Sequence, residues 1–148
     1  MKMKGFSHAI TGLTAVFTVF SGAAAAMARP EDAIGHWATP SKHGVVEIVA
    51  CGTSVCGRLI ESDSIRTNPD MRDAHNGDAA RRNRPLKGLM LLEGFHRGAN
   101  GWDGGTIYNP EDGGTYHATI TLSGPDKLNL KGCVVWPLCK NQTWQRIR

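Results

Sequence analysis

The chain has 148 residues, of which 41% are hydrophobic, and its formal net charge is +4. This length suits one domain with a single core and excludes a pair of independent domains. Two of the surplus positive charges are Lys2 and Lys4, so Arg29–Arg148 holds 15 basic and 13 acidic residues. This near balance gives no reason to expect nucleic acid or an anionic membrane as a partner.

Residues 1–28 predict a cleavable signal peptide. The two lysines precede an apolar stretch, Ala9–Phe20, and a run of small residues follows that ends in the A-x-A site Ala26-Met27-Ala28. The apolar stretch is too short to span a bilayer, and the segment contains no cysteine for lipid attachment. An uncleaved anchor over residues 9–28 is the alternative that remains open. Cleavage after Ala28 leaves a single domain, residues 29–148, which we expect in the periplasm or secreted, without stable membrane insertion.

Short runs of alternating apolar and polar residues dominate the rest of the chain, which is the pattern of half-buried strands. Turn-forming residues at Ser123–Asp126 and at Gly52 separate neighbouring runs and predict two hairpins. In chain order the runs are Val45–Ala50, Val55–Glu61, Leu86–Phe95, Gly105–Tyr108, Thr115–Leu122, Lys127–Lys131 and Gln142–Ile147. Closely spaced strands without helical periodicity predict an all-β fold, an antiparallel sandwich or barrel of about eight strands.

Four cysteines, Cys51, Cys56, Cys133 and Cys139, permit three disulfide connectivities. The two local pairings are favoured because each would join the ends of a tight connection, at about 2 kcal/mol apiece in the chain-entropy model. A metal or redox site is the alternative. Neither local spacing is C-x-x-C, and no histidine lies close by in the sequence.

The long polar segment Ser62–Arg84 is the exception to the strand pattern. A connection of this length in a small β domain is either packed against the barrel or functional. It has room for a short helical turn within Asp73–Arg84. Its acidic side chains offer oxygen ligands of the kind that calcium prefers, but their spacing does not fit a calcium loop, which favours capping and salt bridges. Asn76 and Arg84 are candidates for polar contacts with a ligand at the barrel rim.

A Gly-x-Trp motif, Gly35-His36-Trp37, opens this part of the chain, and Trp144-Gln145-Arg146 closes it. A Gly-x-Trp on the first strand with an Arg on the last resembles the lipocalin and calycin pattern. There the indole plugs one end of an up-and-down barrel, and the guanidinium packs over it as a cation–π pair. The resemblance implies a structural role for Trp37 and Arg146.

The densest block of glycine and aromatic residues is Gly101–Tyr116. Trp102, Tyr108 and Tyr116 offer stacking faces and hydroxyl groups to a ligand, and they are the candidates for the wall of a cavity. The alternative is that these rings form a hairpin and part of the core. Tyr116 shares its face of the predicted strand with small and aliphatic residues, which favours the core.

An ordered set of short motifs extends over nearly all of Ile34–Arg146. They are Gly35-x-Trp37, Cys56-Gly57-Arg58, Asp73-x-x-Asn76, Arg84-Pro85-Leu86-x-Gly88, Gly105-x-Ile107-Tyr108-Asn109-Pro110, Gly114-Thr115-Tyr116, Leu128-x-Leu130-x-Gly132 and Trp144-x-Arg146. In this order they resemble a bacterial secreted family known as domain-of-unknown-function family 2147. The resemblance implies a lipocalin-like barrel in the periplasm and no settled activity. Asn109 stands where relatives often carry Asp, which weakens any catalytic role that depends on a carboxylate at this position.

We therefore expect a monomeric or weakly dimeric barrel that binds a small molecule in its lumen or mouth. An envelope structural or interaction protein is the alternative, and an exposed apolar patch or a free edge strand would mark it. An enzyme acting on cell-envelope material is a third hypothesis, and a carboxylate such as Asp73 or Asp103 in a cleft would mark it. The sequence predicts no catalytic residue, no cofactor and no metal site; its histidines show no ligand spacing.

Overall fold

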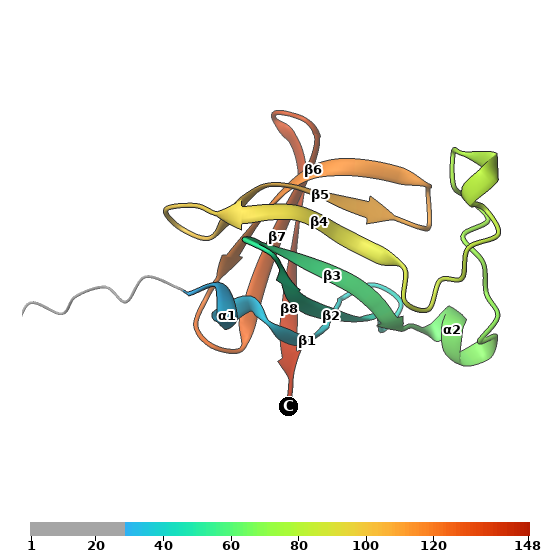
Figure 1. The fold of residues 1–148 in the computed structure, drawn as a ribbon, viewed down its shortest axis with the longest axis horizontal. Helices are drawn as coiled ribbons and strands as arrows, with labels where there is room; N and C mark the ends of the chain where they lie inside the picture. The colour runs from blue at the N-terminus through green and yellow to red at the C-terminus, as the bar shows by residue number, and fades with distance from the viewer. Residues whose placement is uncertain (1–28) are drawn as a thin grey trace, which may run out of the picture.

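Eight antiparallel strands pair in chain order, and the last also pairs with the first, so the sheet closes into a barrel (Figure 1). The computed structural model describes residues 29–148. The strands are β1 (Gly35–Ala38), β2 (Val45–Cys51), β3 (Ser54–Glu61), β4 (Met90–Arg97), β5 (Trp102–Asn109), β6 (Gly114–Leu122), β7 (Lys127–Val135) and β8 (Leu138–Ile147). The predicted all-β up-and-down barrel is confirmed, whereas the predicted signal peptide lies outside the described residues.

Three short helical segments lie outside the sheet. They are α1 (Pro30–Ala33), α2 (Asp63–Thr67) and a 3-10 turn, η1 (Ala79–Arg81). Only η1 falls where the sequence left room for a helical turn, and Asp78 caps it by accepting a hydrogen bond from the Ala80 N–H. No helix within residues 29–148 is long and apolar enough to cross a membrane.

One end of the barrel is closed by Trp37 and Arg146. Trp37 is completely buried, and its Nε1 donates a 2.8 Å hydrogen bond to the Ala33 carbonyl at the end of α1. The Arg146 guanidinium lies 4.2 Å from the centroid of the Trp37 ring. It also donates to the carbonyl oxygens of Pro125 and Ile34, at 2.7 and 2.8 Å, and to that of Asp32. One side chain thus joins the last strand, the β6–β7 turn and the segment before the first strand.

The largest buried side chains gather toward this closed end. Trp102 begins β5, Phe95 lies near the end of β4, and Leu128 lies at the start of β7. These positions border the β4–β5 and β6–β7 turns, on the same side as α1. Phe95 packs directly on Gly105, where an added Cβ would lie 2.4 Å from the ring. Bulky residues therefore fill the closed half of the lumen, because small ones make room for them.

The other end is bordered by the connections that follow β1, β3, β5 and β7. The β3–β4 connection includes Leu86–Leu89, which the sequence pattern assigned to a strand. The structure differs because Gly88 adopts φ +83° and the Leu89 N–H donates to the Leu86 carbonyl, so the chain turns before β4 begins at Met90.

The disulfides join Cys51 to Cys56 and Cys133 to Cys139, so the two predicted local pairings are confirmed. The first spans the β2–β3 hairpin near the closed end. The second joins residues that face each other in register across β7 and β8, near the tip of that hairpin. The two bridges thus stabilise hairpins at opposite ends of the barrel.

We predict that Arg146→Met lowers the free energy of unfolding by about 3 kcal/mol, because three carbonyl oxygens lose a charged donor and Trp37 loses its cation. Urea unfolding followed by far-ultraviolet circular dichroism measures this loss. Arg148→Met is the matched control, because Arg148 is exposed and pairs only with Asp126, near the same end. Equal stability of the two variants would contradict a closing role for Arg146.

Candidate functional site

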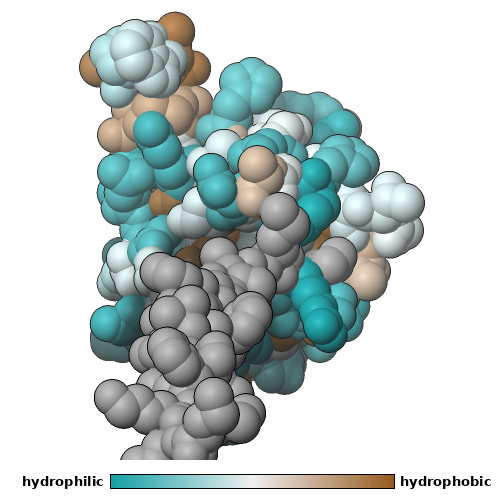
Figure 2. All heavy atoms as spheres, turned by 90° about the vertical axis from the view of Figure 1, so that its left-hand side faces the viewer, coloured by the Kyte–Doolittle hydropathy of each residue, from teal (hydrophilic) through white to brown (hydrophobic). Residues whose placement is uncertain are grey.

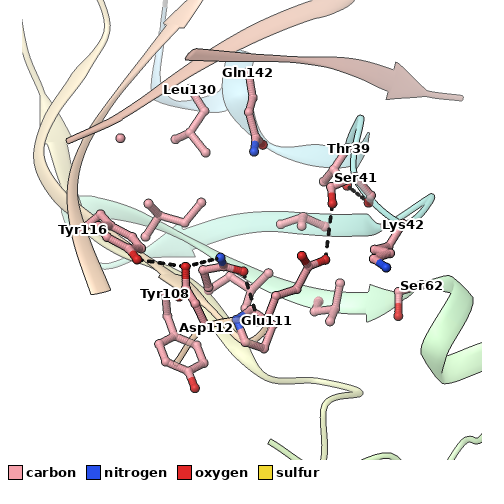
Figure 3. Close-up of a pocket in the computed structure, with 18 of the residues that line it drawn as sticks. Thr39, Ser41, Lys42, Ser62, Tyr108, Glu111, Asp112, Tyr116, Leu130 and Gln142 are labelled. Carbon is pink, nitrogen blue, oxygen red and sulfur yellow. Dashed lines mark hydrogen bonds between the residues drawn. The ribbon is translucent and has the colours of Figure 1, made fainter. Parts of the chain in front are cut away.

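A cavity of about 860 Å³ occupies the end of the barrel opposite Trp37 (Figure 3). Its wall is formed by strands, and its rim by residues of the connections after β1, β3 and β5 and by the β7–β8 hairpin. The inward positions of β7 explain the space: Leu128 and Leu130 are followed by Gly132. Gly132 lines the cavity without a side chain to fill it, and an added Cβ there would be in ordinary contact with Ile107 at 3.4 Å.

The inner wall of the cavity is apolar. Its residues come from six strands and project toward one another across the lumen. They are Val46, Leu59, Leu91, Ile107, Leu130 and Trp144. Trp144 is 2% exposed, and its Nε1 donates to Gln142 Oε1 at 2.9 Å, so its polar atom is satisfied within the protein. This wall offers an apolar surface suited to the apolar part of a ligand.

The rim of the cavity is polar and carries charges of both signs. Ser41 donates a hydrogen bond to Glu111 across the mouth at 3.3 Å, as Figure 3 shows. Lys42 and Lys140 also line the rim, and within residues 29–148 neither forms an ion pair with a carboxylate. Arg72, which also lines the cavity, and the rim carboxylates Glu111 and Asp112 likewise form no ion pair in the described chain, so the cavity lining carries three unpaired basic groups and two unpaired carboxylates.

Asp112 has its hydrogen-bonding capacity satisfied within the β5–β6 turn. Its carboxylate accepts hydrogen bonds from the Gly114 N–H, the Tyr116 hydroxyl and the Asn109 amide, at 2.8, 2.9 and 2.8 Å. Burial raises the pKa of Asp112, but these hydrogen bonds together lower it by more than burial raises it. Its pKa therefore lies below the ordinary value. The hydrogen bond to Asp112 in turn raises the pKa of Tyr116. Asp112 is thus an ionised structural group.

A second polar cluster consists of Asp73, Asn76, Arg84 and Tyr108, of which only Tyr108 also lines the cavity. Asp73 is completely buried, and it accepts hydrogen bonds from Tyr108 Oη at 2.6 Å, Arg84 Nε at 2.8 Å and Asn76 Nδ2 at 2.9 Å. The Arg84 guanidinium also lies 5.0 Å from the centroid of the Tyr108 ring. Because Tyr108 is on β5 and the other three are on the β3–β4 connection, the cluster fixes that long connection to the barrel wall.

Tight contact at the β5–β6 turn fixes the same connection a second time. Gly113 adopts φ +72°, and an added Cβ there would lie 2.0 Å from the His75 carbonyl oxygen. His75 Nδ1 lies 3.3 Å from the Pro110 carbonyl oxygen. Only glycine permits both the backbone conformation and the approach at this position. The Ser62–Arg84 segment is therefore held to the barrel at Asp73–Asn76 and at Arg84.

The structure places the five residues predicted to contact a ligand in three different environments: the cavity, the Asp73 cluster and the core. Tyr116 and Tyr108 line the cavity, but the Tyr108 ring lies on the other side of β5 from Tyr116 and Leu130 in Figure 3, where its hydroxyl meets Asp73. Asn76 and Arg84 belong to the Asp73 cluster and do not line the cavity. Trp102 is 1% exposed in the core, with the Arg97 guanidinium 5.2 Å from its ring centroid.

Several cavity residues were not identified from the sequence. Lys140 and Gln142 alternate with outward residues of β8 on the same face as Trp144, so extending the strand pattern back from Trp144 would have placed them inside. Ser41 and Lys42 lie in the turn after β1, where no strand alternation applies. Their position at the mouth follows from barrel closure alone.

Neither carboxylate considered for catalysis lines the cavity. Asp73 is paired with Arg84, and Asp103 is exposed at the start of β5, toward the closed end. Within residues 29–148, no three His, Cys, Asp or Glu side chains form a group that could hold a metal ion.

Residues 35–146 match the family model described as "Uncharacterized protein conserved in bacteria (DUF2147)". The chain belongs to this family. Among solved structures, the DUF2147 chain is similar to one described as "Protein HP1028 from the human pathogen Helicobacter pylori belongs to the lipocalin family". The identity is 24%, the TM-score is 0.70, and the match covers 78% of this chain and 82% of that one. This likeness supports a lipocalin-like fold. No curated protein matches the sequence.

We predict that Asp73→Asn lowers the free energy of unfolding at pH 7 by about 2–4 kcal/mol, because the donors of Arg84 and Tyr108 lose a buried, charged acceptor. Burial raises the pKa of Asp73, but hydrogen bonds from Tyr108, Asn76 and Arg84 bring it below the ordinary value. The stabilisation by Asp73 is then complete above roughly pH 4 and is lost as the pH falls through the lower pKa of the folded state.

Urea unfolding of wild type and Asp73→Asn at a series of pH values measures this effect. The difference between them should shrink as the solution becomes more acidic. Asp103→Asn is the control, since Asp103 is exposed and forms no ion pair within residues 29–148. A difference that stays constant down to acid pH would contradict the assignment.

Proposed function

We propose that this DUF2147 protein binds a small amphipathic molecule in the open half of its barrel, and that it does so in the periplasm. The observation that carries the proposal is the cavity of about 860 Å³, apolar in its depth and polar at its rim. Ligand cavities in proteins have volumes of this order and combine an apolar wall with a few polar groups. The lipocalin-like fold is compatible with such a role, although fold alone does not assign function.

The distribution of charge at the rim favours an anionic headgroup. Three basic side chains of the lining, Lys42, Lys140 and Arg72, have no carboxylate partner in the described chain. They outnumber the two carboxylates, Asp112 and Glu111, which accept hydrogen bonds from Tyr116 and Ser41. A carboxylate at the mouth would complement the two lysines while its hydrocarbon part contacts Leu130 and Ile107. A single-chain fatty acid is the simplest ligand with this distribution of charge and apolar surface.

The periplasmic location rests on two observations. The pattern of residues 1–28 is that of a cleavable signal peptide. All four cysteines form disulfides, which persist in oxidising compartments. A single domain over residues 29–148, monomeric or weakly dimeric, fits the closed barrel, because one chain completes the sheet.

We predict that wild-type protein binds a dansyl-labelled undecanoic acid and that Gly132→Leu weakens this binding at least about tenfold, since the new side chain occupies the lumen. Fluorescence titration measures the affinity, and unfolding curves check that the variant folds. Gly77→Leu is the matched control, because an added Cβ at Gly77 meets nothing within 4 Å. Dodecanoate should displace the probe better than dodecanol does, owing to Lys42 and Lys140.

Two results would contradict the proposal. One is the absence of probe binding by folded wild-type protein. The other is equal binding by wild type and a folded Gly132→Leu variant, because the probe would then lie outside the barrel.

A further inference from the structure

The tip of the β7–β8 hairpin exposes a compact group of large apolar side chains. Val134, Val135, Trp136 and Leu138 are between 61% and 79% exposed, and they are four of the five large exposed hydrophobic residues in the described chain. The hairpin rises above the rest of the barrel in Figure 1, and brown hydrophobic atoms stand at that height in Figure 2. Apolar groups gathered in this way mark an interaction site rather than scattered surface hydrophobes.

This apolar tip is held in a fixed conformation. Cys133 and Cys139 are disulfide-bonded directly below it, and Val135 pairs with Leu138 across the turn. The tip cannot fold back to bury its own side chains without breaking this pairing. A preorganised projection of this kind loses little conformational freedom when it meets a partner.

The charge of the hairpin is strongly one-sided. Residues 127–148 contain no acidic residue, and of their five basic residues Lys131 and Lys140 lie in the half of the hairpin toward the tip. Lys131 and Lys140 are exposed on the two strands just below the apolar tip. The acidic residues of the mouth, Glu111 and Asp112, lie in the β5–β6 turn, which Figure 1 places away from the hairpin. An anionic surface is therefore the complement of this end of the molecule.

We propose that the β7–β8 tip docks on an anionic lipid bilayer. Trp136 suits the headgroup region, where an indole finds both apolar and polar surroundings, and the adjacent valines and leucine suit the boundary with the acyl chains. Lys131 and Lys140 then lie at the level of the lipid phosphates. The contact is peripheral and reversible, because only the tip enters the interface.

Docking places the cavity mouth beside the membrane. Val134, Leu138 and Lys140 belong to the hairpin and also line the cavity, so the docking surface continues into the lumen. This inference deepens the proposed function and rests on it, since a barrel that carries a fatty acid can exchange its ligand with the bilayer at this contact. Val135, Trp136 and Lys131 do not line the cavity, which allows docking and ligand binding to be tested separately.

The test is vesicle flotation with full-length chain expressed and recovered from the periplasmic fraction. The vesicles contain equal parts of phosphatidylglycerol and phosphatidylethanolamine, or phosphatidylcholine alone. Wild type should float with the anionic vesicles, and the double variant Val135→Ser, Trp136→Ser should lose at least about tenfold of this binding. Lys131→Glu should weaken it and make the remainder less sensitive to salt. Both variants should bind the dansyl probe as wild type does.

Matched controls come from the opposite end of the barrel. Ile147→Ser removes the fifth exposed apolar side chain, and Lys127→Glu reverses a charge at the other end of β7; neither should change flotation. Absence of wild-type flotation, or equal losses in tip and control variants, would overturn the proposal. So would analytical ultracentrifugation showing a wild-type dimer that the tip variant abolishes, because the tip would then be an interface between two copies. Loss of probe binding in wild type would instead refute the proposed function.

Discussion

The contact of Arg146 with Trp37 determines how the lumen can be used. A closed sheet of eight strands has two ends, and a cavity that retains a ligand needs one of them sealed. Here the guanidinium of the last strand lies over the indole of the first and bonds to carbonyl oxygens on both sides of it. Large side chains such as Phe95 and Trp102 then fill the closed half. The cavity of about 860 Å³ lies at the other end, where its mouth opens.

The mouth depends on a different interaction. The β3–β4 connection is long enough to cover or to obstruct the opening, yet Asp73 fixes it to the outer side of β5 through Tyr108, Arg84 and Asn76. A completely buried carboxylate is costly unless it is paired, and this one has a charged partner and two neutral donors. The cluster therefore resembles an active site in composition while acting as a structural anchor. The charged groups at the mouth that could bind an anionic ligand include Lys42 and Lys140.

Strand alternation predicted most of the fold. Runs such as Thr115–Leu122 and Val55–Glu61 lie within β6 and β3, and the two local disulfides followed from cysteine spacing. Leu86 was misassigned because the positive φ at Gly88 cannot be inferred from a pattern of apolar residues. The individual aromatic residues were harder. Whether Tyr108 faces the lumen or the Asp73 cluster depends on which side of β5 is inside, and the bulge between Trp102 and Gly105 shifts that register.

The net charge of the chain did not reveal the proposed docking surface at the tip of the β7–β8 hairpin. Arg29–Arg148 is nearly balanced, which argued against an anionic membrane as a partner, but residues 127–148 contain no acidic residue at all. In the fold, two of the five basic residues of this stretch, Lys131 and Lys140, lie toward the tip that carries Trp136. Only the pairing of β7 with β8 shows that lysines separated in the chain flank one apolar tip.

Native mass spectrometry tests most directly whether the cavity holds an amphipathic molecule. The protein is purified, non-reduced, from the periplasmic fraction of a bacterium that expresses the full chain. We expect a reproducible adduct of small-molecule mass that disappears on denaturation, with the polypeptide lighter by the four hydrogens of its two disulfides. A folded chain that carries no adduct, and acquires none when fatty acids are added, would contradict this expectation.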